Sequence, residues 1–137
     1  MLRVGLTGGL ASGKSFVGRA LADLGCLLIQ ADELGHQVLE PGGEAYDGVI
    51  REFGPEIVRA DGTIDRPKLA ALVFHDSQRL AALNALVHPP VWAREHRLME
   101  DHAAAHPHGI AVVEAAILVE TGSYRNYAKL ILSLIHI

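Results

Sequence analysis

The pattern of apolar and polar positions differs between the ends of the chain and its middle. Residues 2–6, 26–29, 110–113 and 129–132 are short, mostly apolar runs, which predicts strands covered on both faces. Residues 14–24 carry apolar side chains at helical spacing, and Gly25 follows where a left-handed helix end is favoured. A strand, a helix and a strand in so few residues predict a right-handed βαβ unit and therefore a parallel sheet.

The middle of the chain has helical segments separated by turn residues. Asp65 and Asp76 precede two of these segments and are expected to cap them. The Pro89-Pro90 pair is expected to end one helix and to open the next. The predicted helices span residues 33–39, 44–53, 68–74, 77–87 and 89–106. The sequence thus predicts a parallel α/β core with a helical insertion over about residues 33–106 and no long linker.

The junction between the first strand and the first helix carries the pattern G-x-x-x-x-G-K-[ST], typical of a phosphate-binding loop. Its glycines let backbone N–H groups turn inward around a phosphate, and the helix starting near Gly13 directs its positive end at the same anion. Lys14 can supply a charge to the β- and γ-phosphates, and the Ser15 hydroxyl can bind Mg²⁺. A glycine-rich connection with a surface lysine is the alternative. The residues predicted to contact the nucleotide are Gly8, Gly9, Ala11, Ser12, Gly13, Lys14, Ser15 and Phe16.

A carboxylate follows the second predicted strand. Asp32 lies where it could accept a proton from an attacking hydroxyl, or could cap the next helix, and the two roles can coexist. Ligands of parallel sheets bind beyond the carboxyl ends of the strands. Residues 8–15, 30–32 and 114–120 are therefore expected to converge at one edge of the sheet.

Composition limits the class of protein. The 137 residues are 50% hydrophobic and 20% charged, as in a soluble globular domain with a core of its own. A net charge of −4 argues against a general binder of nucleic acids or membrane surfaces, and no transmembrane stretch or signal peptide is recognisable. The single cysteine, Cys26, excludes an internal disulfide framework and fits a cytoplasmic setting.

Taken together and in order, these motifs resemble the dephospho-coenzyme A kinases. The resemblance rests on GLTGGLASGKS at residues 5–15, QAD at 30–32, the pair His88-Pro89, and ILVE at 117–120. It implies a P-loop NTPase-type fold and transfer of the ATP γ-phosphoryl group to the ribose 3′-hydroxyl of dephospho-coenzyme A. That reaction gives coenzyme A and ADP in the last step of coenzyme A biosynthesis.

The resemblance also implies residue roles. Asp32 would be the general base and contact the acceptor, while Lys14 would act catalytically on the transferring phosphoryl group. Ser15 would bind Mg²⁺, and His88 would bind the acceptor from the helical insertion. As an alternative, His88 caps or packs at a helix start before Pro89.

Apart from a milder change at Ala115-Ala116, the sequence departs from the family pattern in two places. Gln30 stands where the family has the first acid of an acidic triplet, which implies weaker organisation of Mg²⁺. Family members continue past Leu132 through an arginine-bearing lid, whereas here the hexapeptide at 132–137 resembles a translated sequencing adaptor. We therefore expect a single kinase domain over residues 1–132, incomplete at its C-terminus, and a non-native tail over 133–137.

Other interpretations remain open. The chain could be a related P-loop kinase of a nucleotide, nucleoside or sugar acid, or a nucleotide-binding fragment without activity. The histidines at 102, 106 and 108 indicate a solvated helix end more than a metal site. Glu95 is expected on the charged face of the last helix, and Trp92 in the helical core or, alternatively, in the acceptor pocket.

Overall fold

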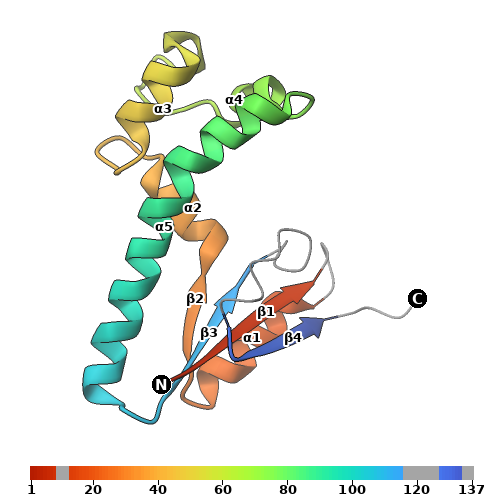
Figure 1. Ribbon diagram of the computed structural model, residues 1–137, viewed down its shortest axis with the longest axis vertical. Coiled ribbons are helices and arrows are strands. Elements are labelled where there is room, and N and C mark those ends of the chain that lie inside the picture. Colours follow the sequence, from red (N-terminus) through yellow and green to blue (C-terminus); the bar gives the residue numbers. More distant parts are fainter. Residues whose placement is uncertain (9–12, 116–126, 134–137) are drawn as a thin grey trace. The chain divides into compact units, whose positions relative to one another are not determined.

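The computed structural model describes residues 1–8, 13–115 and 127–133 (Figure 1). Within these ranges the strands form one sheet in the order β2-β3-β1-β4, and every pairing is parallel. The strands are β1 (Leu2–Gly8), β2 (Leu27–Gln30), β3 (Ile110–Glu114) and β4 (Lys129–Ser133). This sheet confirms the predicted α/β class.

Helix α1 (Lys14–Asp23) packs on this sheet because its apolar stripe matches the apolar strands. Val17 and Leu21 contact the buried cluster formed by Val4, Leu6 and Val112. The chain then turns at Gly25, whose φ of +99° is a conformation that glycine adopts without strain. The β1–α1–β2 connection therefore follows from local sequence.

The chain divides into two compact units. One comprises Met1–Asp32 and Glu95–Ile137 and contains the sheet; the other, Glu33–Arg94, is helical. The helical unit has its own core, which includes Val38, Val49 and Ile57. The remaining helices along the chain are α2 (Ala31–Val38), α3 (Tyr46–Phe53), the short 3₁₀ helix η1 (Pro55–Ile57), α4 (Arg66–Val73) and α5 (Ser77–Ala105).

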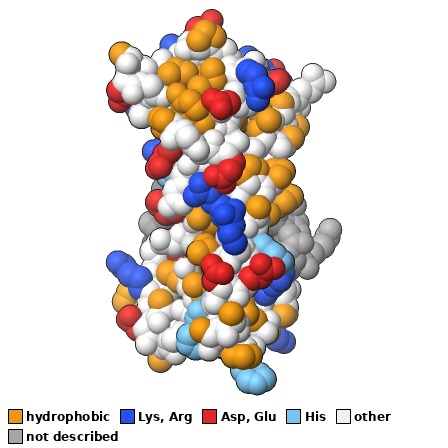
Figure 2. All heavy atoms as spheres, turned by 90° about the vertical axis from the view of Figure 1, so that its left-hand side faces the viewer, with side chains coloured by type: hydrophobic (Ala, Val, Ile, Leu, Met, Phe, Trp, Pro, Cys, Tyr) orange, Lys and Arg blue, Asp and Glu red, His pale blue; other side chains and the backbone are white. Residues whose placement is uncertain are grey.

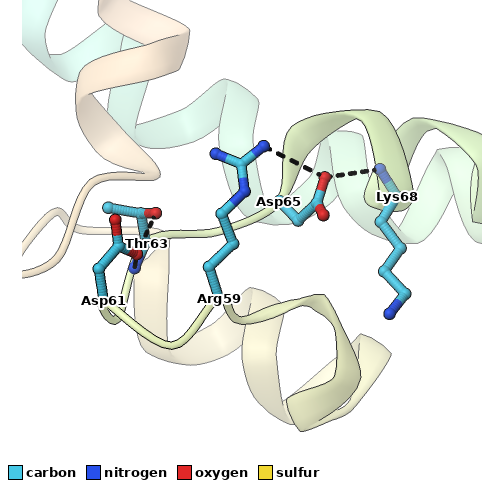
Figure 3. A network of polar contacts seen from close by, with 5 residues as sticks. All are labelled: Arg59, Asp61, Thr63, Asp65 and Lys68. Atoms are coloured by element: carbon cyan, nitrogen blue, oxygen red, sulfur yellow. Dashed lines mark hydrogen bonds and ion pairs between the residues drawn. The ribbon is translucent and has the colours of Figure 1, made fainter.

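The two predicted helix caps are confirmed. The Asp65 carboxylate accepts a hydrogen bond from the Lys68 backbone N–H at 3.2 Å, and it also pairs with Arg59 (Figure 3). Asp76 accepts bonds from the N–H groups of Gln78 and Arg79, both at 3.1 Å. Each aspartate thus satisfies backbone donors that the first helical turn leaves unpaired.

The turn before α4 is held by a third aspartate. Asp61 accepts hydrogen bonds from the hydroxyl and the backbone N–H of Thr63, at 2.6 and 3.0 Å (Figure 3). These two bonds lower the pKa of Asp61. Gly62 between them has a φ of +88°, a conformation that glycine adopts in tight turns without strain.

The prediction of a helix break at Pro89-Pro90 is wrong, because α5 runs without interruption through both prolines. The prolines lack the N–H groups that would bond to the carbonyls one turn earlier. Packing on either side of them keeps the segment helical. Val91 is buried, and Leu86 lies so close to α3 that a Cβ on Gly48 would be 3.3 Å from its Cδ2 atom.

Two side chains of α5 lie in environments opposite to those predicted. Glu95 is only 8% exposed and lies one helical turn from the buried residues Val91 and Met99, so it is not on the charged face. Trp92 is 53% exposed, so it does not pack in the core. Glu95 follows the spacing of the buried stripe, and Trp92 falls beside that stripe.

The surface of the molecule carries charges of both signs. Figure 2 shows acidic and basic side chains interspersed on the face that it presents, with hydrophobic side chains between them. Exposed apolar residues of the helical unit include Phe74, Leu80 and Trp92. Among the described residues, no helix is both long enough and apolar enough to cross a membrane.

The end of the chain is described in part. Ser133, the first residue of the expected tail, is the last residue of β4 and pairs with Gly8 of β1. Residues 134–137 lie outside the described residues.

Candidate nucleotide site at the carboxyl edge of the sheet

The described parts of the predicted phosphate-binding loop are its two ends. Strand β1 ends at the buried Gly8, and Gly13, with a φ of +80°, directly precedes α1. Gly9, Ala11 and Ser12 lie outside the described residues. No side chain caps the start of α1 within the described ranges, and a helix start of this kind can bind an anion through its first N–H groups.

Ser15 meets a buried carboxylate at this helix start. Its hydroxyl donates a hydrogen bond to Oε1 of Glu114, the last residue of β3, at 3.1 Å. Gln30, the last residue of β2, donates from Nε2 to Oε2 of the same carboxylate at 3.4 Å. Glu114 is only 6% exposed, so these contacts supply donors to a carboxylate largely removed from water. Three segments distant in sequence thus meet around one acid.

The strand order explains why this edge can bind a ligand. In the sheet, β2, which follows β1 along the chain, lies on one side of the β1–β3 pair, and β4, which follows β3, lies on the other. Because β1 and β3 are neighbours whose connections leave in opposite directions, a crevice is expected beyond their carboxyl ends. Gly8 ends one of these strands and Glu114 the other.

The residues at this edge fit Mg²⁺ bound together with a nucleotide. A serine hydroxyl and a carboxylate are the oxygen donors that Mg²⁺ prefers, and phosphates usually complete its coordination. Among the described residues, no group of three or more His, Cys, Asp or Glu side chains could hold a metal without such help. In P-loop proteins a loop serine and an acid on a neighbouring strand share this task.

Glu114 is a candidate functional residue that sequence reasoning did not single out. It fell only within a range expected at the sheet edge. An available signal was an acid directly ending the apolar run Ile110–Glu114. That signal becomes specific only once β3 is known to pair with β1.

The other predicted residues of this unit lie as follows. Asp32 is exposed and is the second residue of α2, which begins directly after β2. The predicted helix start at Glu33 is therefore wrong, and so is the alternative that Asp32 caps this helix. The strand passes into the helix without a loop, which leaves no capping position. Lys14 is half-buried at the start of α1, and Phe16 is 73% exposed. Residues 117–120 lie outside the described residues.

His88 belongs to the helical unit. It lies in the interior of α5, so the alternative of a cap at a helix start is wrong. Its ring lies beside that of Trp92, with centroids 5.5 Å apart. Together they present an aromatic pair with one largely exposed member.

The histidines near the end of α5 do not gather around a common point. The rings of His102 and His106 are stacked with centroids 4.5 Å apart, an arrangement in which they do not converge on one ion. The Nε2 atom of His102 is buried and has no hydrogen-bond partner within the described ranges, so the expectation of a solvated side chain is wrong for His102. The turn at Gly109 lies against this atom.

Comparison with known proteins shows which family the sequence of this chain matches. The family model for dephospho-CoA kinase matches residues 2–136. A dephospho-CoA kinase of Moorella thermoacetica is 43% identical over 122 residues, which are 89% of this chain and 58% of that protein. One of Syntrophus aciditrophicus is 41% identical over 132 residues, 96% of this chain and 56% of that protein. The chain therefore spans less than two thirds of the length of these relatives.

A solved structure has a similar fold. The crystal structure of TT1252 from Thermus thermophilus superposes with a TM-score of 0.80 at 32% identity, covering 97% of this chain and 65% of that one. With the sequence pattern of a phosphate-binding loop, a parallel sheet and a family match over almost its whole length, the chain belongs to the dephospho-CoA kinase family.

Proposed function

We propose that this chain carries the nucleotide site of an enzyme that phosphorylates the ribose 3′-hydroxyl of dephospho-coenzyme A with ATP. The products are coenzyme A and ADP. The observation that carries the proposal is the contact between Ser15 of the phosphate-binding loop and the buried Glu114. The relatives named dephospho-CoA kinase support the choice of acceptor.

The phosphate end of ATP would be held by the start of α1. Lys14 and the N–H groups around Gly13 would neutralise the charge that spreads over the transferring phosphoryl group. The Ser15 hydroxyl and the Glu114 carboxylate would hold Mg²⁺. When bound, Mg²⁺ would neutralise the β- and γ-phosphates. These groups are fixed before reaction, which is what phosphoryl transfer chiefly requires.

Asp32 would accept the proton of the acceptor. As the 3′-oxygen forms its bond to the γ-phosphorus, the bond from that phosphorus to the β–γ bridging oxygen breaks, and its electron pair leaves with ADP. The hydroxyl proton passes to the Asp32 carboxylate. Its exposed position at the carboxyl end of β2 leaves this carboxylate open to an incoming hydroxyl.

The acceptor would be recognised by the helical unit. His88 and the exposed face of Trp92 form an aromatic pair against which a planar group of dephospho-coenzyme A can stack. We place the reaction in the cytoplasm, where the chain's free cysteine, Cys26, stays reduced.

The test is ADP release by the purified chain with Mg²⁺ and ATP, with and without dephospho-coenzyme A. We expect stimulation by this acceptor, abolished by Lys14→Ala and retained by Lys68→Ala, an exposed lysine of the helical unit. Stimulation by a different nucleotide, nucleoside or sugar acid instead would assign a related kinase. A sample that binds ATP but responds to no acceptor would contradict the proposed activity for this chain.

A further inference from the structure

Gln30 lies opposite Glu114 at the carboxyl edge of the sheet. The two residues are direct register partners in the parallel pairing of β2 and β3. Partners of this kind point to the same face of a sheet, so their side chains are neighbours by backbone position alone. The distance from Nε2 of Gln30 to Oε2 of Glu114 is 3.4 Å.

The two oxygens of Glu114 are divided between different donors. Oε1 accepts from the Ser15 hydroxyl and Oε2 from the Gln30 amide. An ionised carboxylate can only accept hydrogen bonds, so the amide must present its NH₂ group to it. Gln30 therefore supplies a donor to a buried carboxylate without adding a charge of its own.

The same oxygen is confined on a further side by α1. A Cβ placed on Gly18 would be 3.2 Å from Oε2 of Glu114 and 3.2 Å from Cδ1 of Leu28. The helix backbone thus passes close to the carboxylate because position 18 carries no side chain. Rotation of the carboxylate away from Ser15 would cost it the Gln30 bond.

We propose that Gln30 is a positioning residue, which holds Glu114 with one oxygen towards Ser15 and places no second carboxylate directly opposite it. The inference rests on the proposed function, in which Ser15 and Glu114 bind Mg²⁺ with the nucleotide. A carboxylate in place of the amide would set two negative charges in register. Such a pair repels unless a cation lies between them.

Two substitutions of equal length separate these effects. Gln30→Met keeps the size and removes the donor, whereas Gln30→Glu keeps the size and adds a charge. Gln78→Met, at an exposed position of α5, is the matched control. For each protein we would measure the midpoint of thermal unfolding without nucleotide, in chelator and in Mn²⁺, and the affinity for ADP in Mn²⁺.

The midpoint of thermal unfolding of Gln30→Glu is expected to lie about 3–5 °C below that of wild type in chelator. In Mn²⁺ most of this loss should be recovered. Gln30→Met should show no recovery in Mn²⁺ and should lose about tenfold in affinity for ADP in Mn²⁺, as disturbed outer-sphere groups do. The control should match wild type in both measurements. A residue with a merely structural role would not make unfolding depend on the metal.

Equal Mn²⁺ responses in Gln30→Glu, Gln30→Met and wild type would overturn the inference. The nucleotide-free measurement separates this result from failure of the proposed function. If wild type binds no ADP, the proposed function fails. If Mn²⁺ then still raises the unfolding midpoint of Gln30→Glu, the inferred pairing of positions 30 and 114 is supported. If Mn²⁺ does not raise this midpoint, the pairing is refuted.

Discussion

Two buried glutamates in the sheet-containing unit have opposite surroundings. Glu114 accepts hydrogen bonds from Ser15 and Gln30, whereas no donor reaches Glu95 within the described ranges. Burial raises the pKa of Glu95 to about 7, and Glu95 in turn helps burial to raise the pKa of Tyr127 to about 12. Hydrogen-bond donors favour the charged form of a buried carboxylate, whereas burial without donors favours its protonated form.

The largest effect is expected for the exposed carboxylate of Asp32, which differs from the buried carboxylates of Glu114 and Glu95 in being open to an acceptor. Asp32→Asn removes the proposed proton acceptor and should lower acceptor-dependent turnover by about 10²–10⁴-fold, with ATP affinity unchanged. Steady-state ADP release and ATP binding would measure both quantities. Glu33→Gln, its exposed neighbour, is the control. Near-normal turnover of Asp32→Asn would remove it from the base role.

The next effect concerns Glu95 and the dependence of stability on pH. Its folded-state pKa of about 7 lies above its ordinary value of 4.5, so the folded state keeps a proton that the unfolded state releases as pH rises. Stability should therefore fall between about pH 4.5 and 7, by up to about 3 kcal/mol, and this fall should vanish in Glu95→Gln. Urea unfolding at a series of pH values measures it. Glu52→Gln, at an exposed position, should keep the wild-type dependence of stability on pH. A Glu95→Gln protein whose stability still falls this steeply with pH would contradict the comparison.

A smaller effect is expected from crowding Glu114. Gly18→Ala puts a methyl group 3.2 Å from Oε2, so the carboxylate must shift. The gain in ADP affinity on adding Mg²⁺ should fall by about 1 kcal/mol, roughly fivefold, although alanine favours the helix. Calorimetry with and without Mg²⁺ measures this gain. Gly35→Ala, whose Cβ would meet nothing within 4 Å, should leave the gain unchanged. An unchanged gain in Gly18→Ala would mean that the carboxylate position is not critical.

The smallest effect is expected at an exposed carboxylate of the helical unit. Asp76→Ala removes the cap of α5 and should cost about 0.5–1 kcal/mol of unfolding free energy. Nucleotide affinity should not change, because this aspartate serves only the helix start. Denaturant unfolding and ADP binding check both statements, with exposed Asp101→Ala as the control. A change in ADP affinity would contradict this separation of roles.

Local sequence predicts much of this structure. The β1–α1–β2 unit, the cap residues Asp65 and Asp76 and the place of Ser15 follow from residues close together in the chain. The contact of Ser15 with Glu114 does not, because it depends on the pairing of β1 with β3, which are about a hundred residues apart. The continuous α5 and the burial of Glu95 were missed for a related reason. Packing decides both, against the local preference of proline and of a charged side chain.

The central claim is that Ser15 and Glu114 mark the site where metal and nucleotide bind together. The most direct test is the affinity for ADP in Mg²⁺ and in chelator, for wild type, Glu114→Gln and Glu95→Gln. We predict that Mg²⁺ strengthens ADP binding to wild type and to Glu95→Gln, and that Glu114→Gln loses about 10–100-fold of this gain. An equal gain from Mg²⁺ in all three proteins would contradict the claim.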